Sequence, residues 1–202
     1  MTRTIIFAKA PQPGFAKTRL IPALGAERAA ELARQMLFNT LNEALAADIG
    51  PVELCVTPEI NQAAWQGIHL SAGIEISVQG EGDLGARMAR ATERALKNAE
   101  PVILIGTDCV EMSGNLLCEA AQALLEHDAV LYCTVDGGYA LLGLKRCSLL
   151  LFCDMPWSTD VVASTTISRI GQLGWSVYVG QVLHDVDEPE DLKWLPAQWA
   201  VK

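Results

Sequence analysis

The stretch VILIGTDCVEM, residues 102–112, decides the fold of this chain. Its first half, VILIG, is an unbroken apolar run. Successive side chains of a strand point to opposite faces, so such a run predicts a strand whose two faces are both covered, as in parallel sheets packed between helices. Asp108 follows almost at once and places a carboxylate just beyond the buried strand. The stretch therefore predicts an α/β protein with an acidic group where the sheet ends.

Short apolar runs alternate with helical patterns on both sides of this stretch. Apolar residues recur at helical spacing in residues 33–45 and 84–95, and Asp83 stands where a helix N-cap belongs. This alternation predicts a mostly parallel sheet flanked by helices, because parallel neighbours need crossover connections. With no internal repeat or linker, we expect a single α/β domain over residues 1–202. The other strand-like runs are 4–10, 52–56, 74–78, 129–135, 139–145 and 175–180.

The composition excludes several classes of protein. Half of the 202 residues are hydrophobic and 19% are charged, so the chain buries a core and is not disordered. A net charge of -9 disfavours nucleic acids and anionic membranes as partners. No apolar run is long enough for a membrane span, the opening residues lack the pattern expected of a signal peptide, and the six cysteines show no metal-binding spacing. We expect a cytoplasmic protein with reduced cysteines, and its five tryptophans leave a homo-oligomer open.

A positive cluster near the start of the chain contrasts with the negative whole. In FAKAPQPGFAKTRL, residues 7–20, two prolines stiffen the loop and Gly14 lets the backbone approach a ligand. Lys17 and Arg19 can then reach a diphosphate, the lysine as a point charge and the arginine as a two-pronged donor. The alternative is a solvated loop whose cations balance nearby acids. The loop matches neither of the two common phosphate-binding motifs.

Two acidic segments are candidates for a metal site. The carboxylate of Asp108 suits Mg²⁺ or Mn²⁺, hard ions that bind oxygen ligands and bridge phosphates, although aspartates also cap helices and end strands. A second carboxylate has to come from elsewhere, and Asp185 and Asp187 in HDVDEPEDL, residues 184–192, are the candidates. The EPED part reads as a helix start, so a capping role fits its acids better than it fits Asp187.

The segment TVDGGYALLGL, residues 134–144, reads first as a hairpin, because Asp-Gly and Gly-Gly favour tight turns between strands. Its glycines also permit close contact with a sugar or a phosphate. Asp136 is then free to hold an acceptor hydroxyl or to take its proton as a general base.

Six motifs occur in order over nearly the whole chain, and together they resemble a bacterial family of nucleotide-diphospho-sugar transferases with the glycosyltransferase A, Rossmann-like fold. Most members of that family have no established reaction. The opening and closing motifs are also similar to those of guanylyltransferases of the molybdenum cofactor and phospholactate pathways. Each motif is weak alone, but the ordered set is specific. The motifs are FAKAPQPGFAKTRL (7–20), GDLGARM (82–88), GTDC (106–109), DGGYALLGL (136–144), WST (157–159) and DVDEPEDL (185–192).

The resemblance implies roles for particular residues. The segment 10–19 would wrap a nucleotide diphosphate, with Lys17 and Arg19 as its cationic contacts. Asp108 would be the metal-binding acid, and Asp187 would complete the metal site. The residues implied for the nucleotide are Ala10, Pro11, Gly14, Lys17, Arg19 and Asp83, and those implied for the acceptor side are Gly137, Gly138, Tyr139, Trp157 and Ser158, with Asp136.

Two positions depart from the pattern of that family. Val110 stands where a proline usually follows the Asp-Cys pair, and residues 133–135 replace a segment that is usually of a proline-alanine type. Neither change removes a charged group, so both concern the shape of the acceptor pocket.

The leading hypothesis is a metal-assisted glycosyltransferase that uses a nucleotide diphospho-sugar, with Asp108 and Asp136 as catalytic carboxylates and Mg²⁺ or Mn²⁺ as cofactor. The rival enzyme hypothesis is nucleotidyl transfer from a nucleoside triphosphate with release of pyrophosphate, which needs the same cationic loop and the same metal. A third hypothesis is a nucleotide-binding protein without activity on the same fold. In both enzyme hypotheses the partners are a nucleotide-activated small molecule and an acceptor that the sequence does not identify.

Overall fold

The computed structural model describes residues 1–97 and 100–199. Its core is a seven-stranded sheet with the strand order β3-β2-β1-β4-β6-β5-β7. Only β6 is antiparallel to its neighbours within the described chain, because a hairpin around the Asp-Gly-Gly turn connects it to β5. The predicted α/β class with a mostly parallel sheet is confirmed. The strands are β1 (Arg3–Lys9), β2 (Val52–Thr57), β3 (Ile74–Val78), β4 (Val102–Ile105), β5 (Ala129–Cys133), β6 (Tyr139–Leu144) and β7 (Val177–Val179).

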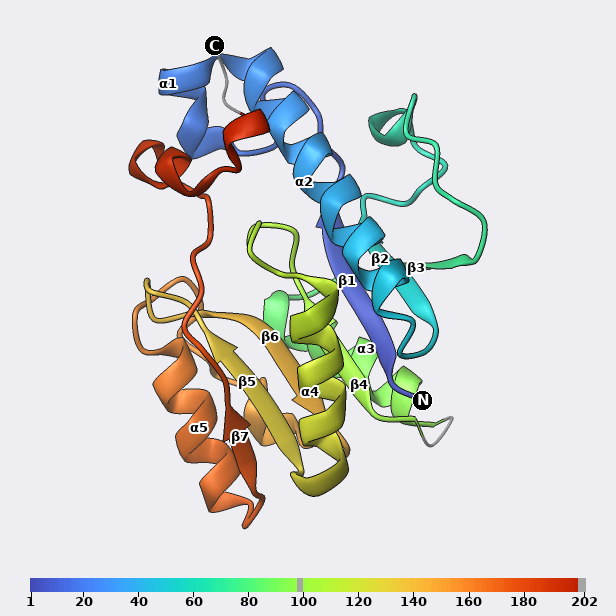
Figure 1. Ribbon diagram of the computed structural model, residues 1–202, viewed down its shortest axis with the longest axis vertical. Helices are drawn as coiled ribbons and strands as arrows, with labels where there is room; N and C mark the ends of the chain where they lie inside the picture. Colours follow the sequence, from blue (N-terminus) through green and yellow to red (C-terminus); the bar gives the residue numbers. More distant parts are fainter. Residues whose placement is uncertain (98–99, 200–202) are drawn as a thin grey trace.

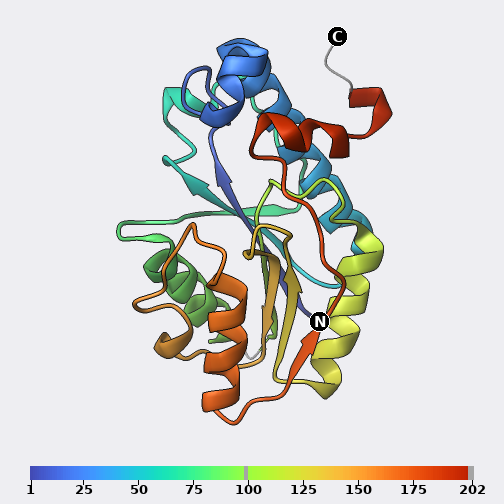
Figure 2. The same ribbon diagram turned by 90° about the vertical axis from the view of Figure 1, so that its left-hand side faces the viewer.

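Helices cover both faces of the sheet, as Figures 1 and 2 show. α2 (Ala26–Ala47) and α4 (Gly114–Glu126) pack on one face, whereas α3 (Leu84–Leu96) and α5 (Val162–Gln172) pack on the other. All four residues of β4 are buried between these layers, as the apolar run predicted. Within the described chain, every helix is too short or too polar to cross a lipid bilayer. The short helices are η1 (Thr18–Leu20), α1 (Ile21–Leu24), η2 (Ala63–Trp65), η3 (Leu149–Leu151), η4 (Pro189–Trp194) and η5 (Ala197–Trp199).

The closing segment, residues 184–199, returns to the opening loop. Beyond β7 the chain runs past the ends of the strands to the part of the molecule that holds α1 and the start of α2 (Figure 2). There Val186 joins Leu20 and Leu32 in a small apolar cluster. Burial of these side chains stabilises the contact between the two distant parts of the chain. The opening loop, the end of β4 and the closing segment therefore meet at one edge of the sheet.

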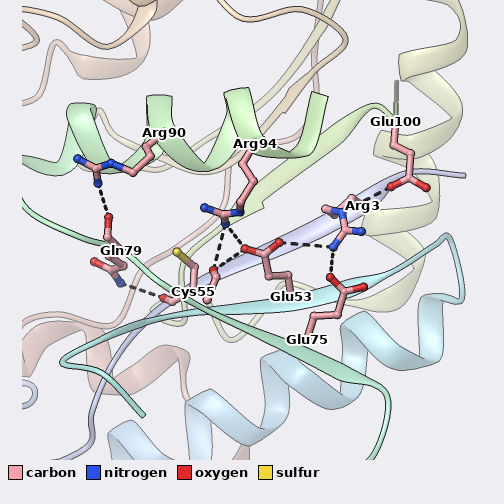
Figure 3. A network of polar contacts seen from close by, with 9 residues as sticks. Arg3, Glu53, Cys55, Glu75, Gln79, Arg90, Arg94 and Glu100 are labelled. Carbon is pink, nitrogen blue, oxygen red and sulfur yellow. Dashed lines mark hydrogen bonds and ion pairs between the residues drawn. The ribbon is translucent and has the colours of Figure 1, made fainter. Parts of the chain in front are cut away.

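A polar network lies under α3, near the amino ends of β1 and β2 (Figure 3). The buried carboxylate of Glu53 pairs with Arg3 at 3.4 Å, accepts a hydrogen bond of 2.5 Å from Ser77, and pairs with Arg94 of α3. Arg3 also pairs with Glu75 at 2.5 Å. Buried charges tolerate few alternative arrangements because an unpaired one is costly, so the network fixes how α3 sits on the sheet.

Candidate functional site

A pocket of about 550 Å³ opens where the carboxyl ends of β1, β2 and β4 meet the opening loop and the closing segment. Ligands of open α/β sheets collect at this edge. One part of the pocket wall is polar and another is apolar. The polar side chains include Lys9, Lys17, Arg87, Asp108, Asp185 and Asp187, and the apolar ones include Phe7, Phe15, Leu84, Met88 and Tyr139.

Lys17 is the centre of the polar part. Its ammonium nitrogen, Nζ, lies 2.5 Å from Asp108 Oδ1 and 2.8 Å from Asp187 Oδ1, and it donates a hydrogen bond of 2.7 Å to the carbonyl oxygen of Val186. The backbone of this residue has a φ of 46°, in the left-handed region that residues other than glycine rarely adopt. Only 7% of its side chain is exposed. Burial opposes its charge, but the two carboxylates outweigh this effect and raise the pKa of Lys17.

Asp185 is a third carboxyl group in the pocket wall. Burial is the main cause that raises its pKa, to about 7, and the negative charges of Asp108, Asp187 and Asp136 add to the effect, while Lys17 acts against it. This carboxyl group therefore gains and loses its proton near neutral pH. Burial first, and then the charge of Asp185, raises the pKa of the Cys109 thiol to about 12, so this thiol stays protonated and is a poor nucleophile.

Arg87 lines the pocket, although the sequence did not single it out as a candidate site residue. Its Nε donates to the carbonyl oxygen of Gly82 at 2.9 Å and its Nη1 to Gln79 Oε1 at 3.3 Å. The buried Gln79 is itself fixed, because its Nε2 donates to the carbonyl oxygens of Ala8 and Cys55. In the described chain no carboxylate pairs with Arg87, so the guanidinium can pair with an anionic ligand. The signal was present in the GDLGARM motif, of which Arg87 is the one basic residue.

Several residues predicted for the nucleotide lie outside the pocket wall. Arg19 is exposed and pairs with Glu188 at 3.5 Å. Asp83 caps α3, because its carboxylate accepts a hydrogen bond of 2.8 Å from the N–H of Ala86. Three more residues belong to the loop that precedes Lys17, namely Ala10, Pro11 and Gly14. Nucleotide binding by these three residues, by Arg19 and by Asp83 stays a prediction.

The residues predicted for the acceptor lie together beside the pocket. Asp136 Oδ1 accepts hydrogen bonds from Thr134 Oγ1 at 2.5 Å and from Gly138 N–H at 3.1 Å, so it builds the turn. Gly137 has a φ of 87°, and a Cβ there would lie 2.1 Å from the carbonyl oxygen of Asp160. The loop that carries Trp157 and Ser158 therefore packs closely on the turn. The rings of Trp157 and Tyr139 pack edge to face, with 6.5 Å between their centroids. Of the residues predicted for the acceptor, Tyr139 alone lines the pocket within the described chain.

The donor set suits a metal ion that arrives with a ligand. Within the described chain no group of three or more His, Cys, Asp or Glu side chains is arranged to hold a metal ion. Asp108 and Asp187 nevertheless direct one carboxylate oxygen each at the same point. Mg²⁺ is usually bound through one or two carboxylates, with substrate phosphates and waters completing its shell. These two residues fit such an ion, and the same hard oxygen donors suit Mn²⁺.

Comparisons with known proteins identify a family and a fold for this chain. The family described as "Uncharacterized protein conserved in bacteria (DUF2064)" matches residues 40–159. The crystal structure of a "putative nucleotide-diphospho-sugar transferase" from Desulfovibrio desulfuricans G20 is 27% identical, with a TM-score of 0.89 over 98% of this chain and 88% of that chain. No curated protein matches the sequence.

Two more distant structures share the fold. Rv0371c of Mycobacterium tuberculosis H37Rv, in complex with manganese, is 16% identical with a TM-score of 0.55 over 96% of this chain and 98% of that chain. CMP:2-keto-3-deoxy-manno-octonic acid synthetase, complexed with CTP, is 12% identical with a TM-score of 0.60 over 96% of both chains. The fold is that of nucleotide-diphospho-sugar transferases, and the resemblance seen in the sequence is confirmed.

Proposed function

The chain belongs to the bacterial family that matches residues 40–159, and from this premise we propose that it is a metal-dependent transferase acting on a nucleotide-activated donor. The observation that carries the proposal is the convergence of Lys17, Asp108 and Asp187 on one point of the pocket, although 170 positions separate the lysine from Asp187. The name of the similar protein from Desulfovibrio desulfuricans supports a nucleotide diphospho-sugar as the donor, and hence a glycosyltransferase.

In this proposal cations of the chain hold the diphosphate of the donor. Lys17, Lys9 and Arg87 line the same pocket, and each brings N–H donors to anionic oxygens. Asp108 and Asp187 would hold Mg²⁺ or Mn²⁺, which when bound neutralises negative charge on the leaving nucleoside diphosphate. The nearby apolar wall, with Phe15, suits the flat face of a base or sugar.

The acceptor would enter beside Tyr139 and the Asp-Gly-Gly turn. Asp185 is our candidate for the carboxylate that receives the proton of the acceptor hydroxyl, because it lines the pocket close to Asp108 and Asp187. Asp136, the base expected from the sequence, has Oδ1 engaged in the turn and raises the pKa of Asp185 through its charge. We therefore assign Asp136 to supporting the acceptor side.

The second candidate function is nucleotidyl transfer. It is favoured by one observation, that a structure with the same fold is a synthetase complexed with CTP. The cationic side chains of the pocket would then bind a triphosphate, and the leaving group would be pyrophosphate.

Ligand-dependent thermal stability separates these functions. The protein is heated with nucleoside diphospho-sugars or with intact triphosphates, each with Mn²⁺ or with EDTA, since a ligand that binds the folded state raises the melting temperature. We expect stabilisation by a diphospho-sugar that requires Mn²⁺, followed by release of the nucleoside diphosphate with an acceptor. Stabilisation by triphosphates only, with release of pyrophosphate, would favour nucleotidyl transfer. A chain that no nucleotide stabilises with Mn²⁺ would contradict both.

A further inference from the structure

The ammonium of Lys17 is fully engaged by the protein. A lysine ammonium carries three N–H donors and no acceptor. Three oxygen atoms surround Lys17 Nζ within 2.8 Å, one each from Asp108, Asp187 and the backbone of Val186. In this arrangement no donor is left for a phosphate, which is the ligand expected of this residue from the sequence.

The ammonium also lies where a divalent cation would bind. Hard divalent ions bind carboxylate oxygens at about 2.0–2.6 Å, so an ion held by Asp108 and Asp187 together would lie close to the position of Lys17 Nζ. Two positive groups at one point repel each other strongly. Lys17 and the ion therefore compete for the same two oxygens.

We infer that Lys17 is a positioning residue that holds Asp108 and Asp187 in place, gives them up to a divalent cation, and then turns its freed ammonium to the phosphates of the donor. This inference rests on the proposed function and adds the order of contacts within the site. It means that Lys17 weakens binding of the ion alone and strengthens binding of the nucleotide once the ion is present. Ion and nucleotide then bind best together.

The surroundings of Lys17 allow this exchange. The carboxylates of Asp108 and Asp187 are 45% and 42% exposed, so an ion from solution reaches them directly, whereas the lysine side chain is 7% exposed. Lys17 lines the pocket, which gives its chain room to turn. The N–H of Val186 donates a hydrogen bond of 2.9 Å to the carbonyl oxygen of Asp108, so the two acids stay together when the lysine leaves.

Mn²⁺ binding without nucleotide tests the inference, with free Mn²⁺ measured by its paramagnetic resonance signal. Lys17→Met keeps an unbranched side chain that ends at the Cε position and removes the ammonium, and we expect it to bind Mn²⁺ roughly tenfold more tightly than the wild type. Lys145→Met is the matched control, because Lys145 lies outside the pocket wall and donates to the carbonyl oxygen of Leu125. We expect the control to stay within about threefold of the wild type, since it removes only a distant charge.

The same variants are then titrated with UDP, GDP and CTP at saturating Mn²⁺. We expect Lys17→Met to bind the preferred nucleotide roughly tenfold more weakly, so that the two effects of one substitution have opposite signs. If the wild type binds Mn²⁺ and Lys17→Met binds it no more tightly, the exchange is overturned while the proposed function stands. If neither protein binds Mn²⁺ with or without nucleotide, the proposed function fails and the inference fails with it.

Labelling of the wild-type protein gives an answer even if Lys17→Met does not fold. Acetylation of lysines by an activated ester is followed by mass spectrometry, with and without Mn²⁺ and without nucleotide. Release of the ammonium should raise the rate at Lys17 several-fold relative to the distant Lys145, whose Nζ donates to the carbonyl oxygen of Leu125. An unchanged ratio of the two rates in the presence of bound Mn²⁺ would overturn the exchange.

Discussion

The N–H of Val186 donates a hydrogen bond of 2.9 Å to the carbonyl oxygen of Asp108. This one backbone contact attaches the closing segment to the end of β4. Because Asp185 and Asp187 flank Val186, it also sets both of these carboxyl groups beside Asp108.

Asp108→Asn should remove Mn²⁺-dependent nucleotide binding, lowering the affinity by at least roughly a hundredfold, because an amide oxygen is a poor substitute for a metal-binding carboxylate. The fold should survive with a loss below about 1 kcal/mol, since the pair with Lys17 is partly exposed and Asp187 remains. Calorimetric titration and thermal denaturation measure the two effects. Asp48→Asn, on the surface at the end of α2, is the control. Normal Mn²⁺-dependent affinity in Asp108→Asn would refute the assignment.

Arg87→Ala should weaken nucleotide binding roughly tenfold or more, because it removes a cation of the pocket that no carboxylate of the described chain neutralises. Binding of Mn²⁺ alone should hardly change, since Arg87 does not contact Asp108 or Asp187. Titration of both ligands distinguishes this pattern from general damage to the site. Arg28→Ala, on the exposed side of α2, should behave like the wild type. Equal binding of nucleotide by Arg87→Ala and the control would exclude Arg87 from the site.

Asp185 should make stability depend on pH. Its folded-state pKa of about 7 lies above the ordinary value of 3.8, so the folded protein holds this proton more tightly than the unfolded chain does. The stabilisation that comes from this bound proton is fully present below about pH 4 and is lost as the pH rises through about 7. On going from pH 4.5 to pH 8.5, the free energy of unfolding of Asp185→Asn should therefore rise by roughly 3 kcal/mol relative to that of the wild type. Urea unfolding in EDTA measures this, and a difference that does not vary with pH would contradict the prediction.

Glu53→Gln should cost roughly 3 kcal/mol of the free energy of unfolding, because it leaves Arg3 and Arg94 without the buried charge that both contact. The matched control is Glu75→Gln. Glu75 also pairs with Arg3, but its side chain is 57% exposed against 6% for Glu53, so its loss should cost below about 1 kcal/mol. Chemical denaturation of both variants tests the difference, and equal costs would show that burial does not decide the strength of this network.

Gly137→Ala should destabilise the protein by roughly 3 kcal/mol, because a methyl group there overlaps the backbone of Asp160 and the φ of 87° is unfavourable for alanine. Gly174→Ala separates the two causes. Gly174 has a φ of 67° with nothing within 4 Å of an added Cβ, so its change should cost only about 1 kcal/mol. Thermal denaturation compares the two variants, and a similar loss in both would mean that the turn yields to the extra methyl group.

The layers of the fold were predictable because buried strands and helices require apolar residues at regular positions in the sequence. The apolar run of β4 and the spacing of apolar residues in α2 and α3 each predicted an element that the structure contains. The direction of β6 followed from the Asp-Gly-Gly turn, since a tight hairpin joins antiparallel strands.

The candidate site was predictable only in part. The resemblance implied that Lys17 contacts the diphosphate and that Asp108 and Asp187 hold the metal ion, whereas the structure shows the lysine in direct contact with both acids. Such a contact depends on side-chain geometry that no local pattern records. Arg87 escaped notice because a basic residue near the start of an amphipathic helix reads as a solvated face.

The route of the closing segment has a consequence for synthesis of the protein. Lys17 leaves the ribosome 170 residues before Asp187 does. A nascent chain thus cannot assemble its cation–acid cluster until Asp187 has also been synthesised. A protease that cuts between β7 and Asp187 would separate Asp187 from the part of the chain that carries Lys17 and Asp108, without cutting any strand of the sheet.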